Sequence, residues 1–300
     1  MAKVCENTVT DYLTANFTED ETEWNPNAVY NYKDEARYGH FIYKYAGEDG
    51  TNTTDNPEIE NEDVLGEWVQ DRPTNYFSML DGANNTSTLN DESIDITVSS
   101  VNNNTISLLK LQGASVYLEV ENDGVVVYSN MVSLADERDV YDEVSYWYEP
   151  FTFKTSLYLE DLPFVTNGIL RIQILNAGAV AGCGNLIHGR NYTIGETLYN
   201  SSLSLESYSR KIADEFGKVN LVPVNSVNLD THEILIATDK IPQLRRKMKE
   251  LDAVPILFIM DESKTSNTEN LLNFGYWETF NMTLTNPSKS IINLTVKGLL

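Results

Sequence analysis

Two stretches of the chain combine residue types that could do chemistry. Cys183 and His188 share the glycine-rich segment CGNLIHG, and an imidazole beside a thiol can generate a nucleophilic thiolate. A lone pair of this kind is far more often structural, and both interpretations stay open. The stretch from Asp81 to Asp91 carries the clustered oxygen atoms that Ca²⁺ prefers, but it lacks the residue order of an EF-hand. A hairpin loop is the simpler interpretation of this second stretch.

The remaining titratable residues show no catalytic or metal-binding spacing. The histidines His40, His188 and His232 are far apart, and no HExxH or similar zinc motif occurs. The chain also lacks the GxSxG, Walker A and GxGxxG patterns. Carboxylate pairs arise by chance among 45 acidic residues, so they give no support to a glycosidase. We therefore expect no enzyme activity, no metal and no cofactor.

The composition of the 300-residue chain narrows the classes of partner. Its net charge of −24 and its pI near 4.3 argue against nucleic acid, whose phosphates need lysine and arginine. No run of about 18 apolar residues is present, which argues against membrane insertion. Cys5 and Cys183 make no disulfide framework, and residues 1–20 lack the apolar core of a signal peptide. These features predict synthesis in a reducing cytoplasm.

Residues 64–175 have the pattern of a β-sandwich domain. Alternating runs such as 93–98 and 168–175 are separated by turn residues, and aromatic residues supply core candidates. The turn 121–123 joins two such runs into a hairpin. About eight strands in this region predict a jelly-roll or a similar sandwich. The run from Tyr146 to Phe151 predicts an aromatic strand near an edge, because Pro150 cannot donate to a ladder.

Residues 1–63 read as an acidic, loop-like N-terminal arm with an aromatic-rich island between Tyr30 and Tyr45. Two interpretations of this island stay open. It packs as a lid on the following domain, or it becomes ordered on a neighbouring subunit, where tyrosine is a favoured residue.

Residues 176–300 predict a smaller, β-rich α+β domain with one short helix. The small residues at 176–184 predict a loop, and Asp239 is the expected cap of the helix. The strand–helix–strand order over 232–260 predicts a right-handed β-α-β crossover with parallel strands, and 275–296 predicts a terminal hairpin. The helix has one apolar stripe, formed by Ile241, Leu244, Met248 and Leu251. Its basic residues are the solvated face.

Four islands of sequence occur in the order typical of one protein family. They are residues 68–82 with the motif RPTN, the CGNLIHG segment, the SYSRK and DEFG motifs within 207–217, and the closing pattern 274–299. Together they resemble a family of structural proteins from tailed bacteriophages, carried in the virion near the tail. The resemblance covers roughly residues 64–300 and leaves the N-terminal arm unexplained. It implies a β-sandwich virion component that forms a homo-oligomer and contacts other phage tail proteins.

The resemblance makes a tail-associated ring or sleeve subunit the expected function, with the virion tail as its location after synthesis in the host cytoplasm. The alternative is a carbohydrate-binding or host-recognition module whose aromatic side chains stack on a host surface glycan. An enzyme acting on cell-envelope polymers is the third class. Residues 207–217 are expected to make an inter-domain or inter-subunit contact, and Trp147 is expected in the sandwich core or its interface. The interface or ligand candidates are Trp68, Tyr146, Trp147, Tyr208, Arg210 and Trp277.

Overall fold

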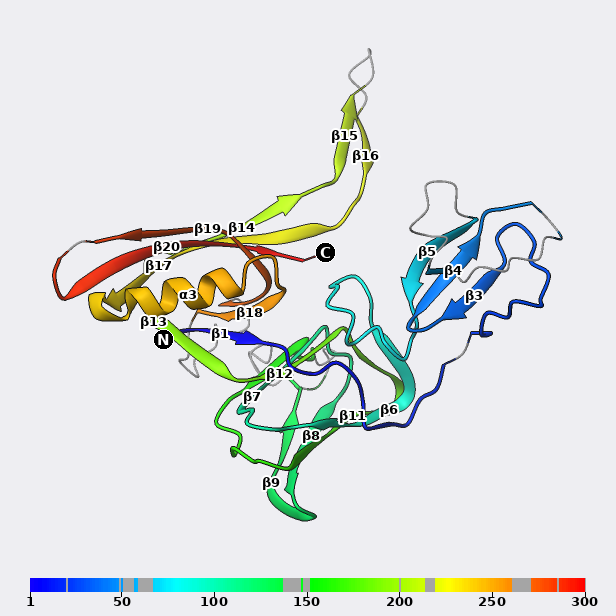
Figure 1. Ribbon diagram of the computed structural model, residues 1–300, viewed down its shortest axis with the longest axis horizontal. Coiled ribbons are helices and arrows are strands. Elements are labelled where there is room, and N and C mark those ends of the chain that lie inside the picture. The colour runs from blue at the N-terminus through cyan, green and yellow to red at the C-terminus, as the bar shows by residue number, and fades with distance from the viewer. Residues whose placement is uncertain are drawn as a thin grey trace.

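The computed structural model describes residues 1–19, 21–48, 50, 57–58, 67–136, 147, 152–199, 201–213, 219–260, 271–284 and 286–299. The protein is mainly β, as predicted, with several antiparallel sheets and the helix α3 (Ile241–Glu250). Figure 1 shows a β-sandwich at the bottom, a β-barrel that carries α3 at the upper left, and a small three-stranded sheet at the right.

The β-sandwich consists of a five-stranded sheet, in the order β2-β6-β11-β8-β9, and a three-stranded sheet, in the order β10-β7-β12. The strands are β2 (Thr14–Ala15), β6 (Thr88–Ser99), β7 (Thr105–Leu109), β8 (Ser115–Asn122), β9 (Val125–Ser133), β10 (Ser156–Leu159), β11 (Gly168–Cys183) and β12 (Asn185–Gly189). Buried and more exposed side chains alternate along β8, and the buried ones join Ile96, Ile172 and Leu108 in one apolar core. The prediction of a sandwich is confirmed.

The loop predicted at 176–184 is wrong, because most of these residues extend β11. After an irregularity between Leu175 and Val180, the strand pairs again with β6 as far as Cys183. Small residues serve close packing here, since a Cβ on Gly182 would lie 2.9 Å from a methyl carbon of Leu89. The next strand, β12, also pairs within the sandwich, so the predicted domain boundary after residue 175 falls inside a strand.

Six antiparallel strands close into the β-barrel. They follow the order β13-β1-β18-β19-β20-β17, and a further pairing of β13 with β17 joins the two ends. The strands are β1 (Ala2–Glu6), β13 (Asn191–Thr197), β17 (Ser226–Ala237), β18 (Ile256–Ile259), β19 (Leu272–Thr283) and β20 (Lys289–Gly298). Buried side chains of these strands, including Phe258 and Leu294, form one core with Leu244 and Met248 of α3. Strands β19 and β20 are the predicted terminal hairpin.

The order β17–α3–β18 is present, but the two strands are antiparallel rather than parallel as predicted. Each neighbouring pair from β17 through β20 and β19 to β18 is antiparallel, so β18 runs opposite to β17. The reason is that the terminal hairpin lies between them in the sheet. A crossover rule for adjacent parallel strands therefore does not apply.

Helix α3 has the predicted apolar stripe, with Leu244, Met248 and Leu251 buried. Its predicted cap is wrong. Asp239 lies inside the 3₁₀ turn η2 (Thr238–Lys240), and the N-cap position is Lys240, which makes no side-chain capping hydrogen bond. No helix in the described part of the chain is long and apolar enough to span a membrane.

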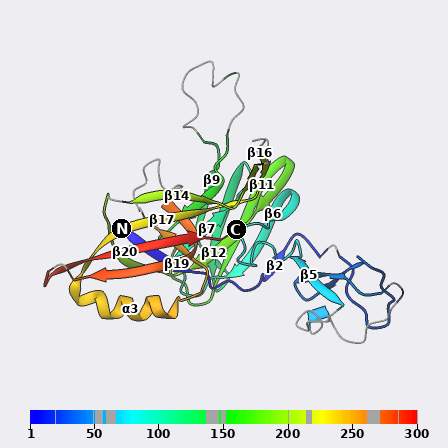
Figure 2. The ribbon, with the colours of Figure 1, turned by 90° about the horizontal axis from the view of Figure 1, so that it is seen from above.

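The segment predicted as a loop-like arm contributes strands to three bodies. Strand β1 belongs to the barrel and β2 to the sandwich, while β3 (Glu35–Tyr38) and β4 (Phe41–Tyr45) form the small sheet with β5 (Trp68–Pro73). The aromatic island is the core of this sheet, where Tyr30, Tyr43 and Tyr45 pack with Trp68. Figure 2 shows the small sheet standing apart at the opposite end of the molecule from α3.

Candidate interaction surface

A two-stranded β-ribbon projects from the barrel, as Figure 1 shows at β15 and β16. Its base is β14 (Ser202–Ser207), paired with the first residues of β17 from Ser226 to Thr231. Its outer part is β15 (Arg210–Ala213), paired with β16 (Val219–Val222). We call residues 202–213 and 219–230 the ribbon. Its sequence folds as a long hairpin because alternating apolar and polar residues form both of its halves.

The ribbon exposes apolar side chains along most of its length. Leu205 is 71% exposed and Leu221 is 65% exposed. The other exposed apolar members are Leu203, Tyr208, Ile212, Val219, Val222 and Val224. An isolated two-stranded hairpin is only marginally stable in water, and exposed apolar surface of this extent marks an interaction site.

The hydroxyl of Ser209 bridges the two halves of the ribbon where the regular ladder is interrupted. Ser209 Oγ donates to the carbonyl of Val224 and accepts from the Val224 amide, both at 3.0 Å. Pro223 lies beside this point and has no amide hydrogen to donate. The bridge therefore holds the outer hairpin on its base.

The ribbon differs in charge from the rest of the chain. Its described outer strands, residues 210–213 and 219–222, carry Arg210 and Lys211 and no acidic residue. Counted over 202–230 the sequence has three basic and four acidic residues, against a net charge of −24 for the whole chain, so the basic excess belongs to the outer strands alone. At the base, Lys297 Nζ lies 2.6 Å from a carboxylate oxygen of Glu206 and over the ring of Tyr208. The outer part of the ribbon is therefore apolar and basic.

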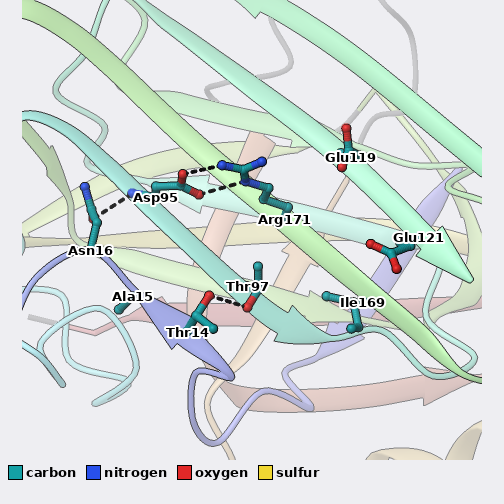
Figure 3. Close-up of a pocket in the computed structure, with 9 residues that line it drawn as sticks. All are labelled: Thr14, Ala15, Asn16, Asp95, Thr97, Glu119, Glu121, Ile169 and Arg171. Carbon is teal, nitrogen blue, oxygen red and sulfur yellow. Dashed lines mark hydrogen bonds and ion pairs between the residues drawn. The ribbon is translucent and has the colours of Figure 1, made fainter. Parts of the chain in front are cut away.

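A hollow of about 340 Å³ lies on the outer face of the five-stranded sheet, far from the ribbon. We call it the acidic hollow. It is lined by Thr14, Ala15, Asn16, Asp95, Thr97, Glu119, Glu121, Ile169 and Arg171, which Figure 3 shows on β2, the turn after it, β6, β8 and β11. The alternation of strands β6, β8 and β11 turns these side chains outward, because their neighbours fill the core.

The charges in the acidic hollow are unequal. Arg171 donates to both carboxylate oxygens of Asp95, at 3.0 and 2.6 Å, and this pair lowers the pKa of Asp95. Glu119 accepts a hydrogen bond of 2.6 Å from Tyr117, and neither Glu119 nor Glu121 forms an ion pair within the described part of the chain. Asp95, Glu119 and Glu121 carry three negative charges against the one positive charge of Arg171, so the hollow has excess negative charge.

The structure does not bring the predicted interface residues together in one site. Trp68 is buried in the small sheet, and Trp277 is half-buried against Phe280 in the barrel. Trp147 is 74% exposed, which argues against the sandwich core, while its predicted place in an interface stays a prediction; Tyr146 lies outside the described residues. Tyr208 and Arg210 do lie close in sequence on the ribbon, within the segment predicted to make a contact. The acidic hollow was missed, because its residues come from four separate stretches of sequence.

Cys183 and His188 have separate partners. The ring nitrogens of His188 lie 2.7 Å from the Thr105 carbonyl and 2.9 Å from Ser100 Oγ. Cys183 donates instead to the carbonyl of Asn185. Burial lowers the pKa of His188 to about 4 and raises the pKa of Cys183 to about 12, so neither favours the charged form near neutral pH. This geometry supports the structural interpretation of the pair.

Asp81 orders the stretch from Asp81 to Asp91, for which the sequence allowed two interpretations, a hairpin loop and a calcium site. Its carboxylate accepts hydrogen bonds from the Ala83 amide at 2.8 Å and from Thr86 Oγ1 at 2.6 Å. Contacts of this kind are typical of an Asx turn. The predicted hairpin is wrong, because this loop joins β5 of the small sheet to β6 of the sandwich, and these two strands belong to different sheets. Among the described residues, no group of three or more His, Cys, Asp or Glu side chains has the geometry to hold a metal ion.

The fold and surfaces define a β-rich protein with an exposed, apolar ribbon and a separate acidic hollow. No family model matches the chain, and no curated protein matches it. Among solved structures, the F5/8 type C domain of a Bacteroides fragilis protein is similar over 39% of this chain and 80% of that chain, at 12% identity and a TM-score of 0.26. A likeness this low supports no argument about the chain's fold or ligand.

Proposed function

We propose that the chain is a structural subunit that acts by protein association, as a ring or sleeve component in the tail region of a phage virion. The observation that carries the association is the ribbon, which projects from the barrel with apolar side chains exposed along it. The assignment to a tailed phage rests on the four sequence islands that resemble the virion protein family. Its partners are copies of itself and neighbouring tail proteins.

The physical argument for association is the cost of leaving the ribbon in water. Burying a side chain such as Leu205 or Leu221 contributes about 1.5–3 kcal/mol relative to leaving it exposed. The ribbon has no second sheet to cover it among the described residues, unlike the sandwich strands. A neighbouring subunit supplies that cover on assembly. The acidic surface elsewhere opposes nonspecific aggregation before assembly.

The experiment that tests this proposal is quantitative mass spectrometry of purified phage-like particles from the source culture. We expect the chain in the particles at a fixed copy number that matches the rotational symmetry of a tail. Particles assembled with Leu205→Ser and Leu221→Ser together are expected to contain much less of it. Leu284→Ser, at an exposed leucine just after β19 and outside the ribbon, is the control. Absence of the chain from the particles would overturn the proposal.

The alternative function, carbohydrate binding, is favoured by one observation. Of the three candidate tryptophans, Trp147 alone exposes most of its side chain, as a ring that stacks on a sugar does. The test is titration of the free protein with host surface glycan while tryptophan fluorescence is recorded. This alternative predicts a saturable shift that Trp147→Ala removes and Trp277→Phe retains.

A further inference from the structure

We infer that the ribbon of one copy docks on the acidic hollow of the next copy, with Arg210 facing Glu119 and Glu121. This inference rests on the proposed self-association and names the two surfaces that carry it. The occupant of the hollow is thus a second copy of this chain. The argument is complementarity of charge and of apolar surface between two parts that lie apart in one molecule.

The basic surface is well placed to reach a neighbour. Arg210 and Lys211 are both exposed on β15, in the outer half of the ribbon. The exposed apolar side chains of Ile212 and Val222 lie on the same face as Arg210, because Ile212 is two residues along β15 and Val222 is opposite Arg210 on β16. Figure 1 shows this hairpin extending away from the barrel and from the sandwich of its own chain. The outer hairpin is therefore accessible to a second molecule.

The acidic surface offers matching features on the sandwich. Glu119 and Glu121 are two residues apart on β8, so they lie on one face of the sheet. Arg171 forms its ion pair with Asp95, and with three carboxylates against one arginine the hollow keeps excess negative charge. The neighbouring edge strand β9 places exposed apolar side chains beside them, with Val126 opposite Glu121 and Met131 opposite Tyr117. Both partners therefore combine apolar side chains with opposite charges.

The pairing of two different surfaces has a consequence for symmetry. A contact between the ribbon of one copy and the sandwich of the next is heterologous, because it joins two different surfaces of the chain. Such contacts close into a ring when the rotation between copies is a whole-number fraction of a turn with no shift along the axis, and otherwise continue as a helix. A ring or a sleeve is the form that the proposed function needs.

Charge reversal in the full chain tests the inference. The variants are Arg210→Glu with Lys211→Glu, Glu119→Lys with Glu121→Lys, and all four changes together, measured by sedimentation equilibrium at low and moderate salt. We expect each double variant to weaken self-association about tenfold or more, and the four-residue variant to recover most of it. Rising salt should weaken the wild type and the recovered variant alike. Circular dichroism verifies that every variant is folded.

Arg245→Glu with Arg246→Glu is the matched control, because both residues are exposed on α3 and the change in net charge is the same as for the ribbon variant. It is expected to leave self-association unchanged. Unchanged association of the ribbon variant, or failure of the four-residue variant to recover, would overturn the inference. A wild-type chain that stays monomeric would overturn it as well. Copy number in particles is measured separately, so the proposed function survives or fails on its own evidence.

Discussion

Gly189 and Glu6 approach each other so closely that a Cβ on Gly189 would lie 2.0 Å from the carbonyl oxygen of Glu6. Gly189 ends β12 of the sandwich and Glu6 ends β1 of the barrel. Beside them, the amide of Thr8 donates to the carbonyl of His188 at 3.0 Å, and its hydroxyl donates to the same oxygen at 2.8 Å. The junction of the two bodies is therefore a backbone contact that tolerates only glycine.

Gly189→Ala is expected to destabilise the protein by roughly 3 kcal/mol, because backbone atoms must move to admit the methyl group. The measurement is urea denaturation of the full chain. Gly178→Ala is the control, since nothing lies within 4 Å of the position of its Cβ and only its positive φ of 77° is unfavourable. That variant should lose about 1 kcal/mol. Equal losses of unfolding free energy for the two variants would show that the backbone at the junction adjusts to the added methyl group.

The stability of the fold is expected to fall as the pH decreases from 6.5 to 4. Burial lowers the pKa of His188 and of His232 to about 4, while an unfolded histidine titrates near 6.5. Between pH 6.5 and pH 4 these histidines are protonated in the unfolded chain but neutral in the folded chain. Their contribution to the free energy of unfolding is therefore fully present above pH 6.5 and is lost as the pH falls toward 4. Each histidine contributes up to about 3 kcal/mol to this loss.

Urea denaturation at pH 7.5 and pH 4.5 measures the effect. Carboxylates also titrate in this range, so the informative quantity is the difference between wild type and a variant. His188→Gln and His232→Gln are each expected to have a shallower loss of stability with falling pH. A variant that keeps the full wild-type slope would contradict the assignment for that histidine.

Trp68 and Trp147 are expected to respond very differently to truncation. Trp68 is buried, with its ring 4.8 Å from that of Tyr30 and 5.2 Å from that of Tyr45, so Trp68→Ala should cost about 3–5 kcal/mol. Trp147 is largely exposed, and Trp147→Ala should change the unfolding free energy by less than about 1 kcal/mol. Denaturation curves recorded by circular dichroism compare the two. A large loss from Trp147→Ala would place its ring in a core.

The two cysteines are expected to be unreactive until the protein unfolds. Cys5 and Cys183 are both free and buried, and burial raises the pKa of each thiol to about 12. At pH 8 this reduces the thiolate fraction by roughly a thousandfold relative to an exposed cysteine. Titration with an aromatic disulfide reagent should label neither thiol in the native protein and both in denaturant. Rapid labelling of the native protein would show that a thiol is accessible.

The sequence predicted the sandwich because local alternation and core packing agree there. Ile94, Ile96 and Val98 recur at every second position of β6, and all three are buried, so periodicity alone located that strand. The apolar stripe of α3 was equally local, since residues three and four positions apart share one face of a helix. Such signals depend on a few neighbouring residues.

The errors arose where distant residues decide the structure. The small residues Ala181 and Gly182 predict a loop by local pattern, yet Leu89 and Gln112 leave space for nothing larger beside Gly182. The antiparallel arrangement of β17 and β18 depends on a hairpin that comes later in the chain. The acidic hollow depends on strands whose order in the sheet differs from their order in the sequence. The sequence predicted the ribbon only as a contact segment, because the local pattern of apolar and polar residues does not distinguish an exposed strand from a buried one.

The placement of β1 has a consequence for how the chain folds during synthesis. Lys3 pairs with Thr193 on one side and with Ile259 on the other, so β1 is synthesised long before either of its partner strands. The sandwich residues can collapse first, whereas the barrel cannot close until synthesis has passed β20. Contacts between such distant positions make closure slow. Strand β1 therefore stays unpaired during much of translation, and in this period its exposed backbone is open to binding by a chaperone.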